Sequence, residues 1–351
     1  MSWQGWRNNA VAYLADLFRV KPSNFDHHPA IRCAIGVAIP LVALAAAGHP
    51  ELIPFGSFGA LTGVFGRGEP HRTRLRSQLM AASLILAAVG AGLALGADGA
   101  PWPLVVGGGA AVAFVGAFLS GAARLKPAGS MFFVLAYSAT VLIGSSTPAL
   151  AFGVSAASAL ASLAIGTAGW VLPGHHTPWS TNSIAWPVGS EWKSIAADGL
   201  THGVAVAIAG SLAAWLGLSH INWAMLTATV PLVGVSTEHR LNRGAQRVIG
   251  TLGGLALASL IFLWNPPVEL KIGALIALQF LIELYVTRNY ALGQVFATPY
   301  SLVLIEVAHE LSPWGLVGER GLETLLGALV GIGMVIAGNR FRGFPPHRES
   351  S

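Results

Sequence analysis

Two arginines spaced four residues apart, Arg243 and Arg247, offer the clearest chemistry in this chain of 351 residues. On an α-helix, side chains four positions apart lie on one face, so the two guanidinium groups would point in the same direction. A planar guanidinium binds a carboxylate through two parallel hydrogen bonds, and an aromatic ring can stack on it. The pair therefore predicts a binding site for an organic anion. The alternative is that both cations only anchor a loop at a membrane surface.

Carboxylates inside apolar segments are the second set of candidates. An ionisable group at the centre of a bilayer costs about 2.5–3.5 kcal/mol to insert, so each one requires a reason. Glu323 follows Arg320 by three residues, and the two either form a structural ion pair or act separately, with Arg320 receiving an anion and Glu323 a proton. Glu306, spaced to meet His309 on one helix face, is the second candidate for coupling protons to transport.

Aromatic side chains form the third set. Trp223 and Tyr300 could stack on the ring of an aromatic ligand. Trp and Tyr also gather at membrane interfaces as anchors, and the sequence favours neither interpretation for these two residues.

The residue patterns of enzymes and metal sites are missing from the sequence. The Gly-x4-Gly-Lys-Ser/Thr loop that binds ATP is absent, and the His pairs at 27–28 and 175–176 are adjacent rather than four apart. The single cysteine, Cys33, excludes an intramolecular disulfide and a thiolate metal cage. A basic stripe with interleaved aromatic residues, typical of nucleic-acid binding, is also absent. We therefore expect no enzymatic activity, no cofactor, no metal and no nucleic-acid partner.

Composition indicates which elements position these residues. Apolar residues make up 54% of the chain and charged residues 10%, with a mean hydropathy of +0.63, whereas about 25% of residues in soluble domains are charged. We predict an all-α polytopic membrane bundle, in which each span needs about 20 predominantly apolar residues. The twelve candidate spans are 31–47, 52–66, 78–96, 103–121, 129–145, 149–172, 199–218, 221–236, 248–264, 270–286, 291–308 and 319–338.

The positions of the cations predict the topology. Of the 20 Lys and Arg residues, all but Lys271 and Arg320 fall at the termini or in every second gap between spans. Cytoplasmic loops are enriched in Lys and Arg, so both termini are expected in the cytoplasm. Membrane lipid is the expected partner of these cations. High Arg, Ala and Gly content indicates a bacterial source and hence a plasma membrane location.

The chain divides into two similar halves. At an offset of 171 residues, Arg72 corresponds to Arg243 and Arg76 to Arg247. We expect a cytoplasmic amphipathic segment at 1–30, six-helix repeats at 31–172 and 199–338, a cytoplasmic linker at 173–198 and a cytoplasmic tail at 339–351. The second and eighth spans are short and interrupted by Pro and Gly, and such a matching pair indicates a transport site.

Two motifs in the second half suggest a family. After the eighth span the chain reads Arg247-x2-Gly250-Thr251-x2-Gly254, and the last span begins Arg320-x2-Glu323-Thr324-x2-Gly327. This pattern resembles the fusaric-acid-resistance-like (FUSC) family of integral membrane transporters, which includes aromatic acid exporters; the first half matches it poorly. The resemblance implies export of small aromatic carboxylates. The substrate-binding candidates are then Arg243, Arg247, Thr251, Trp223, Tyr300 and Arg320, and the proton-coupling candidates are Glu323 and Glu306.

Other functions remain open at this stage. The family's similarity to plant malate channels allows a passive organic-anion channel. A major-facilitator transporter also has six plus six spans, but its acidic-Arg-Gly-Arg loop after the second span is missing, since residues 66–72 read GRGEPHR. A non-transporting membrane scaffold is a further alternative. A homo-oligomer is expected if each chain forms only part of a pore.

Overall fold

The computed structural model describes residues 19–22, 26–96, 99–168, 186–234, 236–309 and 313–342. Within these ranges all regular structure is helical. The α-helices are α2 (His27–Ala46), α3 (Ile53–Ala60), α4 (His71–Gly96), α5 (Trp102–Ala122), α6 (Met131–Ile143), α7 (Pro148–Ala168), α8 (Glu191–Trp215), α9 (Ile221–Ala228), α10 (Thr237–Trp264), α11 (Val268–Tyr285), α12 (Tyr290–His309) and α13 (Pro313–Arg342). Two 3₁₀ turns, η1 (Pro50–Leu52) and η2 (Leu61–Val64), flank α3.

Eight of the described helices are long and apolar enough to cross a membrane: α2, α4, α5, α7, α8, α10, α12 and α13. A shorter apolar helix, α6, has 13 residues. In α11 the charged residues Glu269, Lys271 and Glu283 interrupt the apolar sequence. The predicted class, an all-α polytopic membrane bundle, is confirmed.

The second and eighth predicted spans each contain a helix that is too short to cross a bilayer. Both α3 and α9 have 8 residues, which amounts to about 12 Å of helix at 1.5 Å per residue. Both helical segments begin directly after a histidine with the same backbone conformation, at φ −118° and ψ 59° for His49 and φ −119° and ψ 59° for His220. After Ala228 the described residues before α10, 229–234 and Ser236, form no regular helix.

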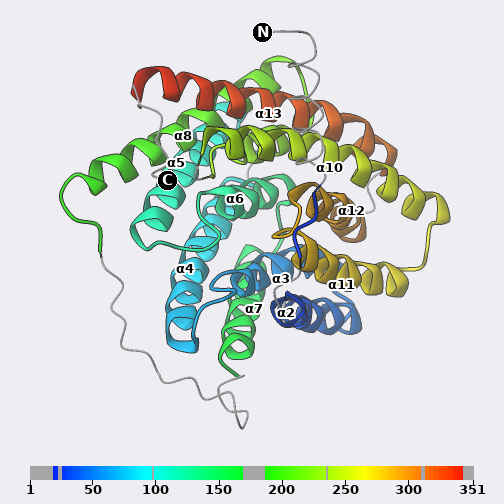
Figure 1. Cartoon of the computed structure of the whole chain (residues 1–351). Helices are drawn as coiled ribbons and strands as arrows, with labels where there is room; N and C mark the ends of the chain where they lie inside the picture. The colour runs from blue at the N-terminus through cyan, green and yellow to red at the C-terminus, as the bar shows by residue number, and fades with distance from the viewer. Residues whose placement is uncertain are drawn as a thin grey trace.

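Helix packing follows the same order in both halves of the chain. In the first half α3 packs on α7, and α4 packs on α6 and α7; in the second half α9 packs on α13, and α10 packs on α12 and α13. The halves meet where α5 packs on α8 and where α11 packs on α2. Figure 1 shows α6 and α12 in the middle of this arrangement.

Small residues bring the helices of the second half close together. A Cβ atom added to Gly250 would lie 2.4 Å from the carbonyl oxygen of Ala291, and one added to Gly254 would lie 2.6 Å from the Cβ of Thr298. Because both glycines lie on one face of α10, the backbone of α12 can approach that face directly. These two glycines of the motif therefore serve close helix packing.

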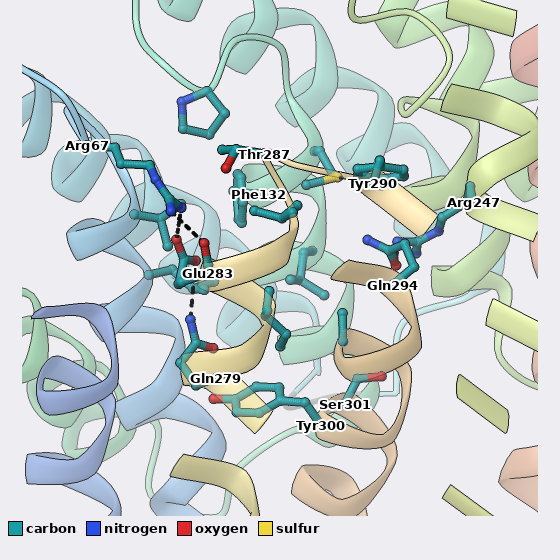
Figure 2. Close-up of a pocket in the computed structure, with 18 of the residues that line it drawn as sticks. Arg67, Phe132, Arg247, Gln279, Glu283, Thr287, Tyr290, Gln294, Tyr300 and Ser301 are labelled. Carbon is teal, nitrogen blue, oxygen red and sulfur yellow. Dashed lines mark hydrogen bonds and ion pairs between the residues drawn. The ribbon is translucent and has the colours of Figure 1, made fainter. Parts of the chain in front are cut away.

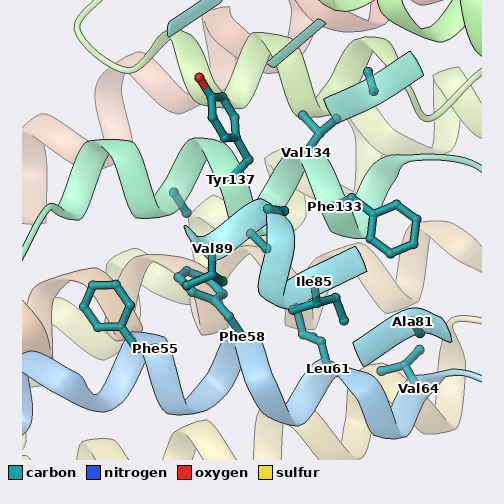
Figure 3. Close-up of a cluster of buried hydrophobic side chains, with 14 of the residues drawn as sticks. Phe55, Phe58, Leu61, Val64, Ala81, Ile85, Val89, Phe133, Val134 and Tyr137 are labelled. Carbon is teal, nitrogen blue, oxygen red and sulfur yellow. The ribbon is translucent and has the colours of Figure 1, made fainter. Parts of the chain in front are cut away.

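Larger side chains fill the first half. Phe55 and Phe58 of α3, Val89 of α4 and Tyr137 of α6 form part of one buried cluster (Figure 3). The Tyr137 hydroxyl donates to the carbonyl oxygen of Val105 at 2.9 Å, so this polar group is satisfied inside an apolar core.

The boundaries of three predicted segments differ from the observed ones. Helix α2 begins at His27, inside the predicted amphipathic segment 1–30. Helix α8 begins at Glu191, inside the predicted linker 173–198, and α13 continues to Arg342, into the predicted tail. Most of the predicted amphipathic segment lies outside the described residues, as do residues 169–185 of the linker region and residues 343–351.

Candidate anion-binding cavity

A cavity of about 950 Å³ lies between the two halves of the bundle. Residues of α2, α3, α6, α9, α10, α11, α12 and α13 line it. Nine of these lining residues are Lys or Arg and three are Asp or Glu, so the cavity favours an anion over a cation.

One side of this cavity carries Arg243, Arg247 and Arg320, which we call the arginine wall. Ser236 caps α10 by accepting a hydrogen bond from the backbone N–H of His239 at 3.2 Å. With the helix started there, Arg243 and Arg247 fall on successive turns and both line the cavity. No ion pair among the residues that the structure describes involves any of the three arginines.

Of the two arginine-wall residues on α10, Arg247 is more deeply buried than Arg243, with 3% of its surface exposed. Its Nη1 donates to the side-chain oxygen of Gln294 on α12, while Nε and Nη2 have no partner among the described residues. Arg243 lies with Cζ 4.5 Å from the centre of the Tyr290 ring. A buried donor left without an acceptor costs about 1–3 kcal/mol, and the described residues supply no acceptor for these two nitrogens.

Arg320, the third member of the arginine wall, lines the same cavity from α13. Its exposed fraction is 2%, and its Cζ lies 3.2 Å from the centre of the Trp223 ring on α9. Its Nε and Nη1 also lack partners within the described ranges. The charges of Arg247 and Arg320 repel each other, and Glu323 attracts Arg320 without forming an ion pair within 4 Å. An anion in the cavity would relieve the repulsion.

The opposite side carries Arg67, Asp26 and Glu283, which we call the paired wall. Gly66, at φ +68°, turns the chain after η2 and brings Arg67 to the cavity. The Arg67 Nη1 lies 2.8 Å from Oε2 of Glu283, which is 3% exposed, and its Nη2 lies 3.4 Å from Oδ1 of Asp26. Gln279 donates to the second oxygen of Glu283 at 3.4 Å. Figure 2 shows Arg67 and Arg247 on opposite sides of the pocket.

Aromatic residues lie between and beside these walls. The Tyr300 hydroxyl lies 2.8 Å from the Ser57 hydroxyl, a hydrogen bond that joins α12 to α3. Trp223, Tyr290 and Phe132 also line the cavity. The cavity therefore combines guanidinium groups that have no carboxylate partner among the described residues with flat aromatic surfaces.

The structure brings together five of the six predicted substrate-binding residues. Arg243, Arg247, Trp223, Tyr300 and Arg320 all line the cavity. Thr251, by contrast, is 1% exposed and is not among the lining residues. It lies next to Gly250 on the stretch of α10 that packs against α12.

The two predicted proton-coupling residues lie elsewhere. Glu306 forms an ion pair with Lys271 of α11. The expected contact with His309 stays a prediction, because the His309 side chain lies outside the described residues. Glu323 accepts a hydrogen bond from the backbone N–H of His220 at 2.9 Å, instead of pairing with Arg320. Neither glutamate lines the cavity, because each is held by a partner that the sequence did not indicate.

Several residues that line the cavity were not predicted from the sequence. Arg67 belongs to the loop cations that predicted the topology, and no sequence motif singled out Glu283. They are 216 residues apart in the chain, so no local spacing links them. Gln294 was also not predicted to line the site, since a single neutral amide in an apolar span belongs to no recognisable binding motif.

Comparison with known proteins supports a family resemblance for the second half. Residues 206–334 match the family model described as fusaric acid resistance protein-like. The resemblance expected from the two motifs is thus confirmed. The matched range includes all of the arginine wall and excludes Arg67 and Asp26.

Two relatives are similar over part of the chain. The uncharacterized membrane protein YvaC of Bacillus subtilis (strain 168) is 30% identical over 154 residues, which are 43% of this chain and 24% of that protein. An uncharacterized protein of Haemophilus influenzae is 33% identical over 113 residues, which are 31% of this chain and 15% of that protein. The matched segments span about a quarter or less of these relatives. No solved structure matches. Together with the eight apolar helices, the similarity identifies a multi-pass membrane protein.

Proposed function

We propose that this protein transports small organic anions, with aromatic carboxylates as the substrate class, through the cavity between its halves. The observation that carries the proposal is the arginine wall, where Arg247 and Arg320 have buried donors without acceptors among the described residues. A substrate carboxylate would supply those acceptors through charge-assisted hydrogen bonds. The similarity of residues 206–334 to a fusaric acid resistance protein-like family supports the same class of function.

The preference for an aromatic substrate rests on the rings beside the arginines. Trp223 lies against Arg320 and Tyr290 lies against Arg243, so an aromatic ring and its carboxylate could contact the wall together. A volume of about 950 Å³ falls within the usual range of small-molecule pockets, roughly 300–1,000 Å³.

We further propose that the two halves are repeats that move against each other around this cavity. The matching packing order and the matching backbone at His49 and His220 support an internal repeat. Paired broken helices at equivalent positions are a common feature of secondary transporters, whose repeats rock around a central site.

The orientation proposed for the chain places both termini in the cytoplasm of a bacterial cell. Five cations that lie outside the predicted spans, Arg19, Lys21, Arg67, Lys126 and Arg288, border the cavity together. Their convergence supports a cytoplasmic mouth, because loops rich in Lys and Arg face the cytoplasm. The oligomeric state stays a prediction of the sequence alone.

A flux assay tests this function. The full chain is reconstituted into liposomes loaded with radiolabelled benzoate, and release is compared for the wild type, Arg247→Ala, Arg320→Ala and Lys193→Ala. Lys193 is an exposed cation that does not line the cavity, so its variant controls for the loss of one charge. We expect the wild type and the control variant to release benzoate at similar rates. Release by both cavity variants should fall to the rate of benzoate-loaded liposomes that contain no protein. Equal release by all four proteins would exclude the arginine wall as the site.

A further inference from the structure

A second polar cluster lies where α9 meets α13, outside the cavity lining. It consists of His220, which precedes α9, with Glu319 and Glu323 on successive turns of α13. One ligand atom from each residue lies within 4.8 Å of the other two. The Nδ1 of His220 is 3.1 Å from Oε2 of Glu319, and Oε1 of Glu323 accepts the His220 backbone N–H at 2.9 Å.

Helix capping explains part of this cluster. The first N–H groups of a helix have no partner inside the helix and need acceptors. Glu319 accepts hydrogen bonds from the backbone N–H of Ser219 at 3.1 Å and from its hydroxyl at 3.0 Å. Together with the bond from His220 to Glu323, these contacts fasten the start of α9 to α13.

Capping leaves one carboxylate oxygen unexplained. Glu323 is 0% exposed, and its Oε2 has no partner among the described residues. A buried carboxylate oxygen without a donor is costly, and a bound cation removes that cost. The unpartnered oxygen belongs to the same carboxylate that completes the cluster.

We propose that His220, Glu319 and Glu323 bind a divalent transition-metal ion, with Zn²⁺ as the representative ion. One imidazole nitrogen and two carboxylate oxygens suit such an ion better than Mg²⁺ or Ca²⁺, which prefer oxygen ligands alone. Tetrahedral Zn²⁺ with bonds near 2.1 Å holds its ligands roughly 3.4 Å apart, so atoms within 4.8 Å need only small side-chain rotations.

Charge and access both allow the ion to bind. The two carboxylates balance a charge of +2, and the nearby Arg320 guanidinium lies against Trp223, among the residues that line the cavity. The side chains of His220 and Glu319 are 17% and 37% exposed, which gives the ion an entry path and leaves room for a water as fourth ligand.

The ion would fasten α13 to α9 beside the arginine wall. Trp223 follows His220 by three residues, and Arg320 lies between the two glutamates in sequence. Metal binding would therefore hold these two cavity residues in their observed arrangement. Local spacing does not indicate this site, because His220 and Glu319 are 99 residues apart.

The first half of the chain provides a matched control. His49 has the same backbone conformation as His220, and its Nδ1 lies 3.0 Å from Oε1 of Glu51. The side chains of this pair are 53% and 51% exposed, and among the described residues no third ligand completes a cluster there. The first-half pair should not bind the ion.

A Zn²⁺ titration tests the proposal. The full chain, purified without a polyhistidine tag and stripped of metal, is titrated with Zn²⁺ against a chromogenic chelator. The variants are His220→Asn, Glu323→Gln and Glu319→Gln, with His49→Asn as the control. Glu319 is partly exposed, so its variant tests the site even if replacement of the buried Glu323 impairs folding.

The expected result is one Zn²⁺ per wild-type chain, with binding weakened in the cluster variants by at least the 10- to 100-fold that a lost supporting contact costs in metal sites. The His49→Asn variant should bind as the wild type does. Equal affinity in the wild type, His220→Asn and Glu319→Gln would overturn the proposal, as would the absence of Zn²⁺ binding by the wild type.

Discussion

Arg67 and Arg247 face one cavity from opposite sides, but their surroundings differ. Arg67 contacts two carboxylates, those of Glu283 and Asp26. Arg247 contacts the neutral amide of Gln294 and keeps two nitrogens without partners among the described residues. A buried charge with its counter-charge in place supports the fold, whereas a buried charge without one weakens it. We therefore expect the paired wall to be structural and the arginine wall to be available to a ligand.

The largest effect is expected from Arg67→Ala. The change leaves Glu283 buried without its cation, which should lower the free energy of unfolding by about 3–5 kcal/mol. Denaturant unfolding in detergent measures the loss. The double variant Arg67→Met with Glu283→Gln removes both charges and should recover much of it. Equal instability of the single and double variants would contradict a structural role for this ion pair.

A smaller effect is expected where α10 packs against α12. In Gly250→Ala the new Cβ would lie 2.5 Å from the Cβ of Gln294, the residue that holds Arg247. Overpacking of this kind costs about 1–3 kcal/mol, and it should also weaken ligand binding by displacing Gln294. Gly273→Ala on α11 is the control, because nothing lies within 4 Å of its added Cβ. The same unfolding experiment compares the two variants, and an equal effect of both would show that the close approach at Gly250 is unimportant.

Neutralising the arginine wall should change stability less than breaking the paired wall. Arg247→Met and Arg320→Met remove unpaired buried charges that repel each other. We expect a free energy of unfolding within about 1 kcal/mol of the wild type, or above it, since replacing buried charges with apolar groups is often neutral or stabilising. Losses as large as those of Arg67→Ala would show that both walls are structural.

The smallest effect concerns the contact between Tyr300 and Ser57. Tyr300→Phe removes one interhelical hydrogen bond, which in membrane proteins contributes about 0.6 kcal/mol on average. Thermal unfolding with and without benzoate separates its two possible roles. A stability change of that size with unchanged benzoate stabilisation would assign Tyr300 to packing, and lost benzoate stabilisation would assign it to ligand binding.

The sequence predicted the helices better than the partners of individual residues. Apolar length located every α-helix of the described residues, because burial in lipid constrains composition strongly. The starts are less well predicted, since α10 begins at Thr237 and the predicted span at residue 248. Spacing also placed Arg243 and Arg247 on one face, and both line the cavity. Local patterns can predict such features because they depend on neighbouring residues.

Contacts between distant segments account for what the sequence did not predict. The Arg67–Glu283 pair joins residues 216 positions apart, and Glu323 contacts His220 across 103 positions. For Glu306, helical spacing gave no indication of the contact with Lys271, which lies 35 positions away on another helix. Each of these depends on how helices pack across the bundle, which the order of residues along one helix does not specify.

The most direct test of the arginine wall is a calorimetric titration of benzoate into the purified full chain. We predict that Arg247→Met and Arg320→Met each weaken binding by about 10- to 100-fold, because a hydrogen bond to a charged group contributes about 1.5–3 kcal/mol. Lys193→Ala should bind as the wild type does. Equal affinity for benzoate in the wild type and both arginine variants would contradict the assignment of this wall as the anion-binding site.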